Sequence, residues 1–305
     1  YSGRASFLTL IIVKNIIFKA AHIAVSNVSI IFQNIIFLDV NLYDSPALSS
    51  DIKFFNTTWD TLEDFVKNGI TFTSVKLLHL KIIDSSFSGT LIKTKSQYFS
   101  LYITNVTNIA RNGSDEVIYF QFIEKYTWTV SHNTIVMINV TMKTTAKLNA
   151  YFTLESNAIK IIGANMNIQL KNVTILNFSS AMYLTNKVFP DGFQMSLSVY
   201  IQDSYFSYNR VQTSGGALYV NLSLFRVLQA AIYINHSIFI DNRAQKHGAG
   251  LYAIARLFKY RMTRHLSIQI VQSEFRNNLA HISGGALFFG SGIMSSFRQC
   301  TFAVN

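Results

Sequence analysis

Carboxylates are the side chains whose spacing would matter most if this chain were an enzyme. Hydrolysis of a glycosidic bond needs two carboxyl groups close together, and calcium-dependent elimination needs clustered acidic ligands. The acids of the C-terminal third are Asp203, Asp241 and Glu274, which occupy three different positions of the internal repeat in that region. The sequence therefore predicts no catalytic residues. A polysaccharide lyase or glycoside hydrolase remains the alternative.

Histidine and cysteine are too scattered to predict a metal site. The seven histidines show no spacing such as i, i+4. The single cysteine, Cys300, excludes an internal disulfide and a cysteine-rich zinc site, and we interpret it as a small buried residue. Gly215-Gly216 lacks the Lys-Ser/Thr pair that follows the glycines of a phosphate-binding loop. We expect no metal and no cofactor.

Basic residues give the chain a formal net charge of +11 at pH 7, which favours acidic partners. The densest basic run is ARLFKYRMTRH (255–265), which we predict to be a surface insertion. Aromatic residues alternate with cations there as in single-strand nucleic-acid sites, but one short run is weak support, and we expect no nucleic acid. The candidate ligand-binding residues, for an anionic glycan or a surface protein, are Arg256, Lys259, Arg261 and Arg264.

An internal repeat must position these residues. Its three clearest copies are 201–219, 234–252 and 270–288. In each copy a phenylalanine is followed three residues later by asparagine and nine residues later by glycine. Alternating apolar residues precede the phenylalanine, as in a β-strand. A fixed period of this length indicates stacked repeats that bury their faces against one another.

Searching upstream for the same pattern finds weaker copies over nearly the whole chain, about ten in all. The first seven have Asn or Asp at a sharp bend three residues before the interior position, because these residues tolerate left-handed backbone geometry. Stacked copies would lie about 4.8 Å apart, so their amides can form hydrogen bonds along the stack. The predicted bend column consists of Asn15, Asn34, Asp84, Asn105, Asn139, Asn172 and Asp203, continued by His236, Gln272 and Gln299.

Nine N-x-S/T sequons would be glycan acceptors in a secreted eukaryotic protein. Four of them lie in or beside the bend column, where the backbone geometry already explains why asparagine occurs: Asn105, Asn139, Asn172 and Asn235. The remaining five are the glycosylation candidates: Asn27, Asn56, Asn112, Asn177 and Asn221.

The fold class predicted by this repeat is all-β, a right-handed parallel β-helix of about ten coils with loop insertions. Intervals of 19 and 21 residues between bend positions leave no room for the four strands of a propeller blade. Parallel crossovers are right-handed in nearly all cases. We expect one domain over residues 1–305, a piece of a longer chain. The 50-residue interval between Asn34 and Asp84 predicts an insertion over 38–76 with a short helix near 60–69.

The GGAL segments (215–218, 284–287) and the F-x-x-N segments (206–209, 239–242, 275–278, 302–305) resemble the repeats of chlamydial polymorphic outer-membrane proteins. They are also similar to pectin-lyase-like β-helix repeats. The similarity is good over about 200–305, degraded over 80–200 and faint before that. It implies a right-handed β-helix on a secreted or surface-anchored protein, commonly an adhesive one. It implies no catalytic residues, since this motif is structural.

Hydropathy gives no candidate for a membrane span in this segment. The longest apolar stretch, 7–18, has twelve residues and is interrupted by Lys14. Together these observations favour a non-enzymatic extracellular or cell-surface β-helix that acts as a scaffold for adhesion or glycan binding. A passive spacer is a third reading. A lateral groove lined by stacked carboxylates would favour the enzyme, and one lined by aromatic and neutral polar residues would favour binding.

Overall fold

The computed structural model describes residues 9–19, 22–25, 28–38, 41–44, 49–60, 69–88, 90–110, 117–122, 133–144, 157–163, 165–186, 195–223, 227–256 and 266–305. Over these ranges the chain forms β-strands joined by bends and contains no helix. Each coil contributes strands to three layers, which we number in the order in which the chain passes through them.

Layer 1 holds the strand before the sharp bend of each coil: β1 (Thr9–Lys14), β4 (Val28–Gln33), β7 (Ser49–Phe55), β12 (Asn133–Thr144), β14 (Met166–Leu176), β16 (Met195–Gln202), β20 (Val227–Asn235), β24 (Leu266–Val271) and β28 (Ile293–Arg298). Layer 2 holds the short strand after the bend: β2 (Ile17–Lys19), β5 (Ile36–Leu38), β8 (Thr58–Asp60), β17 (Tyr205–Ser207), β21 (Ile238–Ile240), β25 (Glu274–Arg276) and β29 (Thr301–Ala303).

Layer 3 holds the returning strand: β3 (His22–Val25), β6 (Asn41–Asp44), β11 (Ile118–Phe122), β13 (Asn157–Ile162), β15 (Ser180–Thr185), β19 (Leu218–Ser223), β23 (Leu251–Arg256) and β27 (Leu287–Phe289). The long strands β9 (Gly69–Ser88) and β10 (Ile92–Ala110) pass through all three layers, and β12 and β14 continue from layer 1 into layer 2. A separate three-stranded sheet contains β18 (Arg210–Val211), β22 (Arg243–Ala244) and β26 (Leu279–Ala280).

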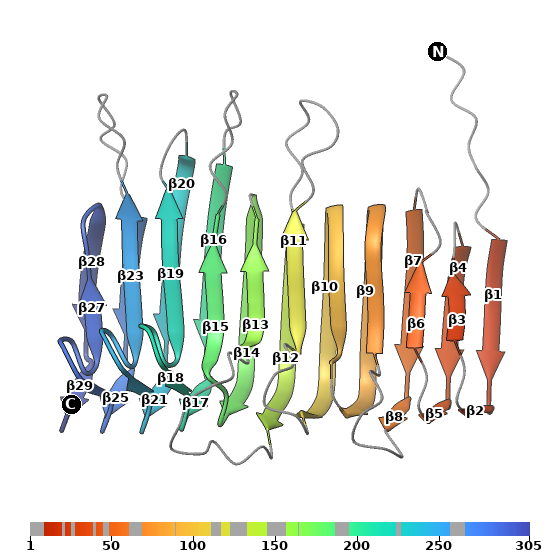
Figure 1. Ribbon diagram of the computed structural model, residues 1–305, viewed down its shortest axis with the longest axis horizontal. Helices are drawn as coiled ribbons and strands as arrows, with labels where there is room; N and C mark the ends of the chain where they lie inside the picture. Colours follow the sequence, from red (N-terminus) through yellow and green to blue (C-terminus); the bar gives the residue numbers. More distant parts are fainter. Residues whose placement is uncertain are drawn as a thin grey trace.

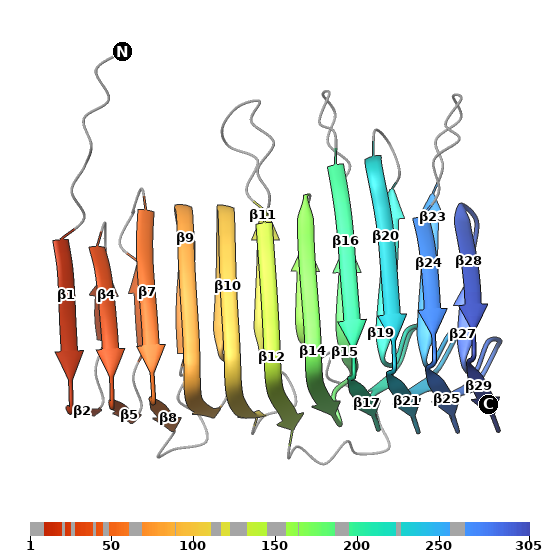
Figure 2. The ribbon, with the colours of Figure 1, turned by 180° about the vertical axis from the view of Figure 1, so that it is seen from behind.

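Successive coils pair in parallel, so each strand lies beside its own copy one coil away. In Figure 1 the layer 3 strands β15, β19 and β23 run upward on the near side while the chain advances toward the blue end on the left. Figure 2, from behind, shows β16, β20 and β24 running downward. This sense of rotation is right-handed. The described residues therefore form the right-handed parallel β-helix that the sequence predicted.

Aromatic rings stack along the interior of layer 2 in two groups. Near the N-terminus the ring centroids of Phe37 and Trp59 are 4.2 Å apart, and those of Trp59 and Phe87 are 5.3 Å apart. Near the C-terminus Phe239 lies 4.9 Å from Phe206 and 4.6 Å from Phe275. The phenylalanines of the repeat thus lie at the interior position that the sequence predicted, and in these two groups of coils the rings exclude water from the centre. Non-aromatic residues fill the buried positions between the two groups: Asn108, Met142 and Ile175.

The interval between Asn34 and Asp84 contains a further coil, and the expectation of one long insertion over 38–76 was wrong. Strands β6, β7 and β8 lie within it and pair with the coils on both sides. The coil has the pattern of the other copies, with a bend at Asn56 and the interior Trp59 three residues later. The sequence reasoning had assigned Asn56 to the glycosylation candidates instead. The short helix expected near 60–69 falls mostly on 61–68, outside the described residues.

Eleven residues with positive φ, each at the turn from layer 1 to layer 2, form the bend column: Asn15, Asn34, Asn56, Asp84, Asn105, Asn139, Asn172, Asp203, His236, Gln272 and Gln299. Their φ values lie between 46° and 56°, in the left-handed region. In the first seven coils the side chains of the bend column form an exposed hydrogen-bonded ladder in two runs, from Asn15 to Asn56 and from Asp84 to Asn172. Asn139 Nδ2 donates to Asn105 Oδ1 at 2.9 Å, and Asn172 Nδ2 donates to Asn139 Oδ1 at 2.9 Å.

A second ladder, which the sequence analysis did not anticipate, lies inside the C-terminal coils. It consists of the asparagines of the F-x-x-N segments. Asn209, Asn242 and Asn278 have no exposed surface. Asn209 Nδ2 donates to Asn242 Oδ1 and Asn242 Nδ2 donates to Asn278 Oδ1, both at 2.9 Å. These buried amides connect neighbouring coils where no water can take their place.

Candidate functional site

A lateral groove of about 800 Å³ lies on the outer surface of layer 1 over β12, β14 and β16. Outward positions of β14 and β16 face each other in register across one coil step, with Gln169 beside Tyr200 and Lys171 beside Gln202. Val136 and Ile138 of β12 add an apolar row next to Gln169 and Lys171. The polar side chains of the lining are Asn165, Asn167, Gln169, Lys171, Ser196, Ser198, Tyr200 and Gln202.

The groove lining combines hydrogen-bonding groups with one accessible aromatic ring. Tyr200 is 49% exposed, and the ring of Tyr233 on the next coil lies 6.4 Å from it at a tilt of 50°. The lining contains no carboxylate and one cation, Lys171. Amides both donate and accept hydrogen bonds, so this surface can bind a ligand rich in hydroxyl groups without a charge partner.

The opposite face, on layer 3, carries an outward column of tyrosines that we call the tyrosine column: Tyr119, Tyr183, Tyr219 and Tyr252. Tyr219 lies 4.6 Å from Tyr183 and 5.1 Å from Tyr252, measured between ring centroids. The rings are parallel within 4° and 12°, so they cover one another's faces and present edges and hydroxyls to solvent. Lys160 Nζ lies between two of them, 5.8 Å from the Tyr119 ring and 5.9 Å from the Tyr183 ring.

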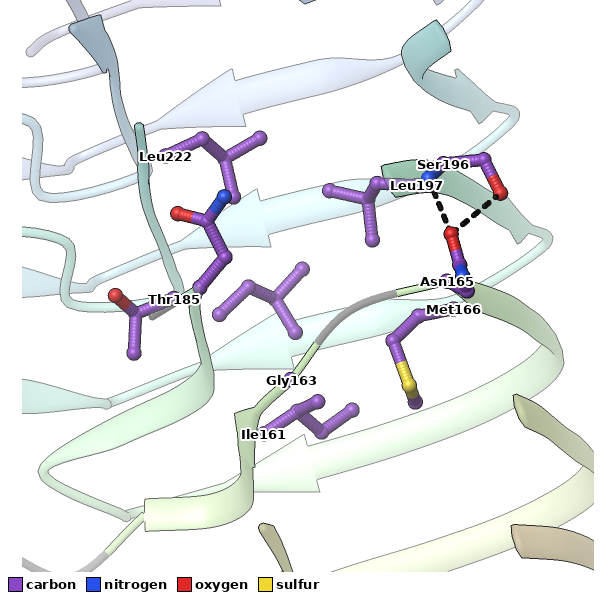
Figure 3. A pocket seen from close by; sticks show the side chains of 10 residues that line it. Ile161, Gly163, Asn165, Met166, Thr185, Ser196, Leu197 and Leu222 are labelled. Carbon is purple, nitrogen blue, oxygen red and sulfur yellow. Dashed lines mark hydrogen bonds between the residues drawn. The ribbon is translucent and has the colours of Figure 1, made fainter. Parts of the chain in front are cut away.

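A small cavity between the layers, shown in Figure 3, is not a ligand site. Its volume is about 20 Å³, which suits a single water molecule rather than a sugar ring. Asn165 lies at its edge and accepts a hydrogen bond from the backbone N–H of Ser196 at 2.7 Å. This contact ties one coil to the next at the start of layer 1, so the role of Asn165 is structural.

The structure describes one of the four basic residues predicted to bind a ligand. Arg256 is exposed at the end of β23, on the face of the tyrosine column. Burial and the neighbouring Tyr219 raise the pKa of Tyr252, and the Arg256 guanidinium acts in the opposite direction. Lys259, Arg261 and Arg264 lie outside the described residues.

The glycosylation candidates fall in different environments. Asn27 and Asn112 lie outside the described residues. Asn56 is a bend residue with φ 48° whose Nδ2 donates to Asn34 Oδ1, so its separation from the bend column was wrong. Asn177 also has positive φ, 66°, and donates to the Thr144 carbonyl. Asn221 lies on β19, half-buried, with its Nδ2 3.1 Å from the Tyr219 hydroxyl oxygen.

Carboxylates do not gather on the described coils. Asp203 is a bend residue, Asp241 lies at a later bend, and Glu274 lies on β25. In the register, the neighbours of Glu274 are Ile238 and Thr301 rather than acids. In the described part of the chain no three His, Cys, Asp or Glu side chains are grouped so that they could hold a metal ion. Nor does any helix there have the length and hydropathy to span a membrane.

Residues 203–221 run from the bend at Asp203 through β17, β18 and the GGAL turn to Asn221 of β19. This segment matches the Chlamydia polymorphic membrane protein (Chlamydia_PMP) repeat. By direct comparison the chain is thus similar to this repeat over one coil, and the parallel coils on both sides repeat the geometry of that coil. No curated protein and no solved structure matches the chain. The resemblance inferred from the GGAL and F-x-x-N segments is confirmed over this stretch.

Sequence reasoning missed both the groove and the tyrosine column. Tyr183, Tyr219 and Tyr252 are 36 and 33 residues apart, close to the repeat period, so a search for aromatic residues at that period would have found the column. The groove has no comparable signal, because its lining comes from mixed residue types on neighbouring coils.

Proposed function

We propose that this chain is a cell-surface β-helix that binds glycans through its lateral groove and performs no catalysis. The observation that carries the proposal is the lining of the groove, with amides, hydroxyls and Tyr200 in register and no carboxylate. The match of residues 203–221 to a membrane-protein repeat supports the surface location.

A sugar chain suits this surface because it presents hydroxyl groups together with apolar C–H patches. Gln169 and Gln202 offer both donors and acceptors, and the exposed ring of Tyr200 offers an apolar surface with a polar end. Strands about 4.8 Å apart repeat these groups along the axis, so an extended polymer can contact several coils at once. A passive spacer would need no such array, and a hydrolase would need paired acids.

Anionic glycans form a second part of the proposal, through the basic insertion. Arg256 and Lys160 place positive charge on the face of the tyrosine column. Lys259, Arg261 and Arg264 lie in the same basic run of the sequence as Arg256. Replacing these three and Arg256 with alanine should reduce retention on immobilised heparin, and unchanged retention by a folded variant would contradict this part alone.

The groove is tested with a panel of neutral and acidic polysaccharides in affinity gel electrophoresis. Gln169→Ala and Tyr200→Ala should each weaken retardation by the polysaccharide that binds, about tenfold, because each removes a contact of about 1 kcal/mol or more. Gln269→Ala is the matched control, since Gln269 is an exposed outward glutamine of layer 1 that does not line the groove. Equal loss in all three variants would contradict the groove as the site. Release of new chain ends from any polysaccharide would favour the enzyme alternative.

A further inference from the structure

A second hollow, of about 520 Å³, lies at the base of the C-terminal coils beside layer 2. Figure 1 shows the short strand β18 in this part of the molecule, next to β17 and β21. The charged residues that line the hollow are Arg210, Asp241 and Arg243. It is separate from the groove of layer 1, and the two share no lining residue.

Two arginines face outward together at this hollow. Arg210 of β18 and Arg243 of β22 are register partners in parallel strands, while Val211 and Ala244 after them are buried. Neighbouring strands are about 4.8 Å apart, so the two guanidinium groups belong to adjacent rows of one surface. Like charges side by side are unfavourable unless an anion offsets them. This pair is therefore a place where an anion would bind favourably.

The protein does not supply that anion. Arg210 Nε is buried and has no hydrogen-bond partner. Among the described residues neither arginine forms an ion pair; the pair recorded in this region joins Arg276 to Glu274 instead. A buried donor without a partner is uncommon in folded proteins and indicates a missing ligand or strain.

Asp241 is the carboxylate in the lining of this hollow. Its negative charge raises the pKa of the neighbouring Tyr208. Tyr208, Asp241, Asn277 and Val304 each follow the phenylalanine of their coil by two residues and hold positive φ, between 46° and 56°. This conformation therefore belongs to the repeat, and its row of bends forms one side of the hollow.

We infer that Arg210 and Arg243 form a binding site for a tetrahedral oxyanion, a sulfate or phosphate group. Guanidinium donates two parallel hydrogen bonds to such a group, and two guanidinium groups in adjacent rows can contact different oxygens of one anion. The anion would offset the repulsion between the two arginines and give Arg210 Nε an acceptor. The site is independent of the glycan groove, because it uses other residues on another layer.

The test is isothermal titration calorimetry of the folded protein at low salt, with inorganic phosphate and inorganic sulfate as the two titrants. Arg243→Gln should weaken binding about tenfold, because it removes charge-assisted hydrogen bonds. Arg243→Lys keeps the charge but loses the paired donors, so it should weaken binding by less. Asp241→Asn should tighten binding, since it removes the negative charge nearest the anion. A phosphate monoester and a sulfated monosaccharide, titrated in parallel, distinguish the two natural sources of the group.

Arg276→Gln is the matched control, because it removes one positive charge nearby from a side chain that does not line the hollow. Arg243 is exposed, so its replacement should leave the fold intact, and circular dichroism checks this. Equal weakening by Arg243→Gln and Arg276→Gln would reduce the effect to general electrostatics and overturn the proposal. So would the absence of binding at millimolar phosphate and sulfate.

Discussion

The coils from Asn15 to Asn172 and the coils from Asp203 onward are both joined by hydrogen bonds between asparagine side chains, but the asparagines lie in different places. In the first group the amide ladder is on the outside, at the bend, as in Asn139 Nδ2 to Asn105 Oδ1. In the second it is inside, as in Asn209 Nδ2 to Asn242 Oδ1. Both ladders join successive coils at nearly the same distance.

The difference shows what each ladder requires of the bend. In the C-terminal coils the bend residues are Asp203, His236, Gln272 and Gln299, and no amide ladder joins these described residues. Their φ values nevertheless stay between 46° and 54°. The backbone geometry is therefore set by the β-helix, whereas asparagine at the bend is set by the exposed ladder. Where the buried ladder joins the coils, the residue type at the bend can vary, and Asp, His and Gln occur there.

The buried ladder should be the more sensitive of the two. Replacing Asn242 with alanine removes an amide that donates to Asn278 Oδ1 and to the Phe206 carbonyl. It also removes the Oδ1 that accepts hydrogen bonds from the backbone N–H and the Nδ2 of Asn209. We expect the free energy of unfolding to fall by about 3 kcal/mol in urea titrations, because buried polar groups lose their partners. A loss below about 1 kcal/mol would show that the buried ladder is not what joins these coils.

The exposed ladder should tolerate the equivalent change better. Asn139→Ala should lower the free energy of unfolding by about 1–2 kcal/mol, through left-handed strain and lost hydrogen bonds that water partly replaces. Asn139→Gly removes the same side chain without the strain, so it should be less damaging than alanine in the same urea titration. If glycine and alanine were equally damaging, the ladder rather than the backbone geometry would account for asparagine at this bend.

Extending the exposed ladder into the C-terminal coils should stabilise them slightly. In His236→Asn the new Nδ2 can donate to Asp203 Oδ1 one coil earlier, as Asn105 donates to Asp84 at 2.8 Å. We expect a gain of about 0.5–1 kcal/mol, read from thermal and urea unfolding. His236→Ala supplies the control, because it lacks the amide at the same φ, and a gain in that variant too would assign the effect to histidine itself.

The smallest expected effect concerns Tyr208 and Asp241, which lie on the C-terminal coils outside the bend column. The negative charge of Asp241 and its hydrogen bond raise the pKa of Tyr208. Because the pKa is higher in the folded than in the unfolded state, this contact stabilises the fold below about pH 10 and is lost as the pH rises through the raised pKa. NMR titration of ring-labelled tyrosine, with Tyr208→Phe for assignment, should show the pKa of Tyr208 fall toward its usual value in Asp241→Asn. An unchanged pKa would contradict the contact.

The sequence by itself determined the fold class, most of the bend column and the interior position of the repeat phenylalanines. These depend on similar residue types that recur at fixed positions in most coils, since such side chains stack when parallel strands pair in register. It also showed that the acids Asp203, Asp241 and Glu274 share no repeat position. The coil at Asn56 was missed although Trp59 follows this bend at the usual spacing, because Asn56 also begins an N-x-S/T sequon and was assigned to that role.

Only the tertiary structure decided which surfaces exist outside the core. Gln169 and Tyr200 are 31 residues apart, and Arg210 and Arg243 are 33 apart; they become neighbours only when the register of each coil is fixed. Coil lengths vary, so no single sequence spacing identifies such pairs. The same register buries Asn242 of an F-x-x-N segment while it exposes Asn139 at the bend. The stacking period is encoded locally, but the groove and the arginine pair arise from which residues neighbouring coils place side by side.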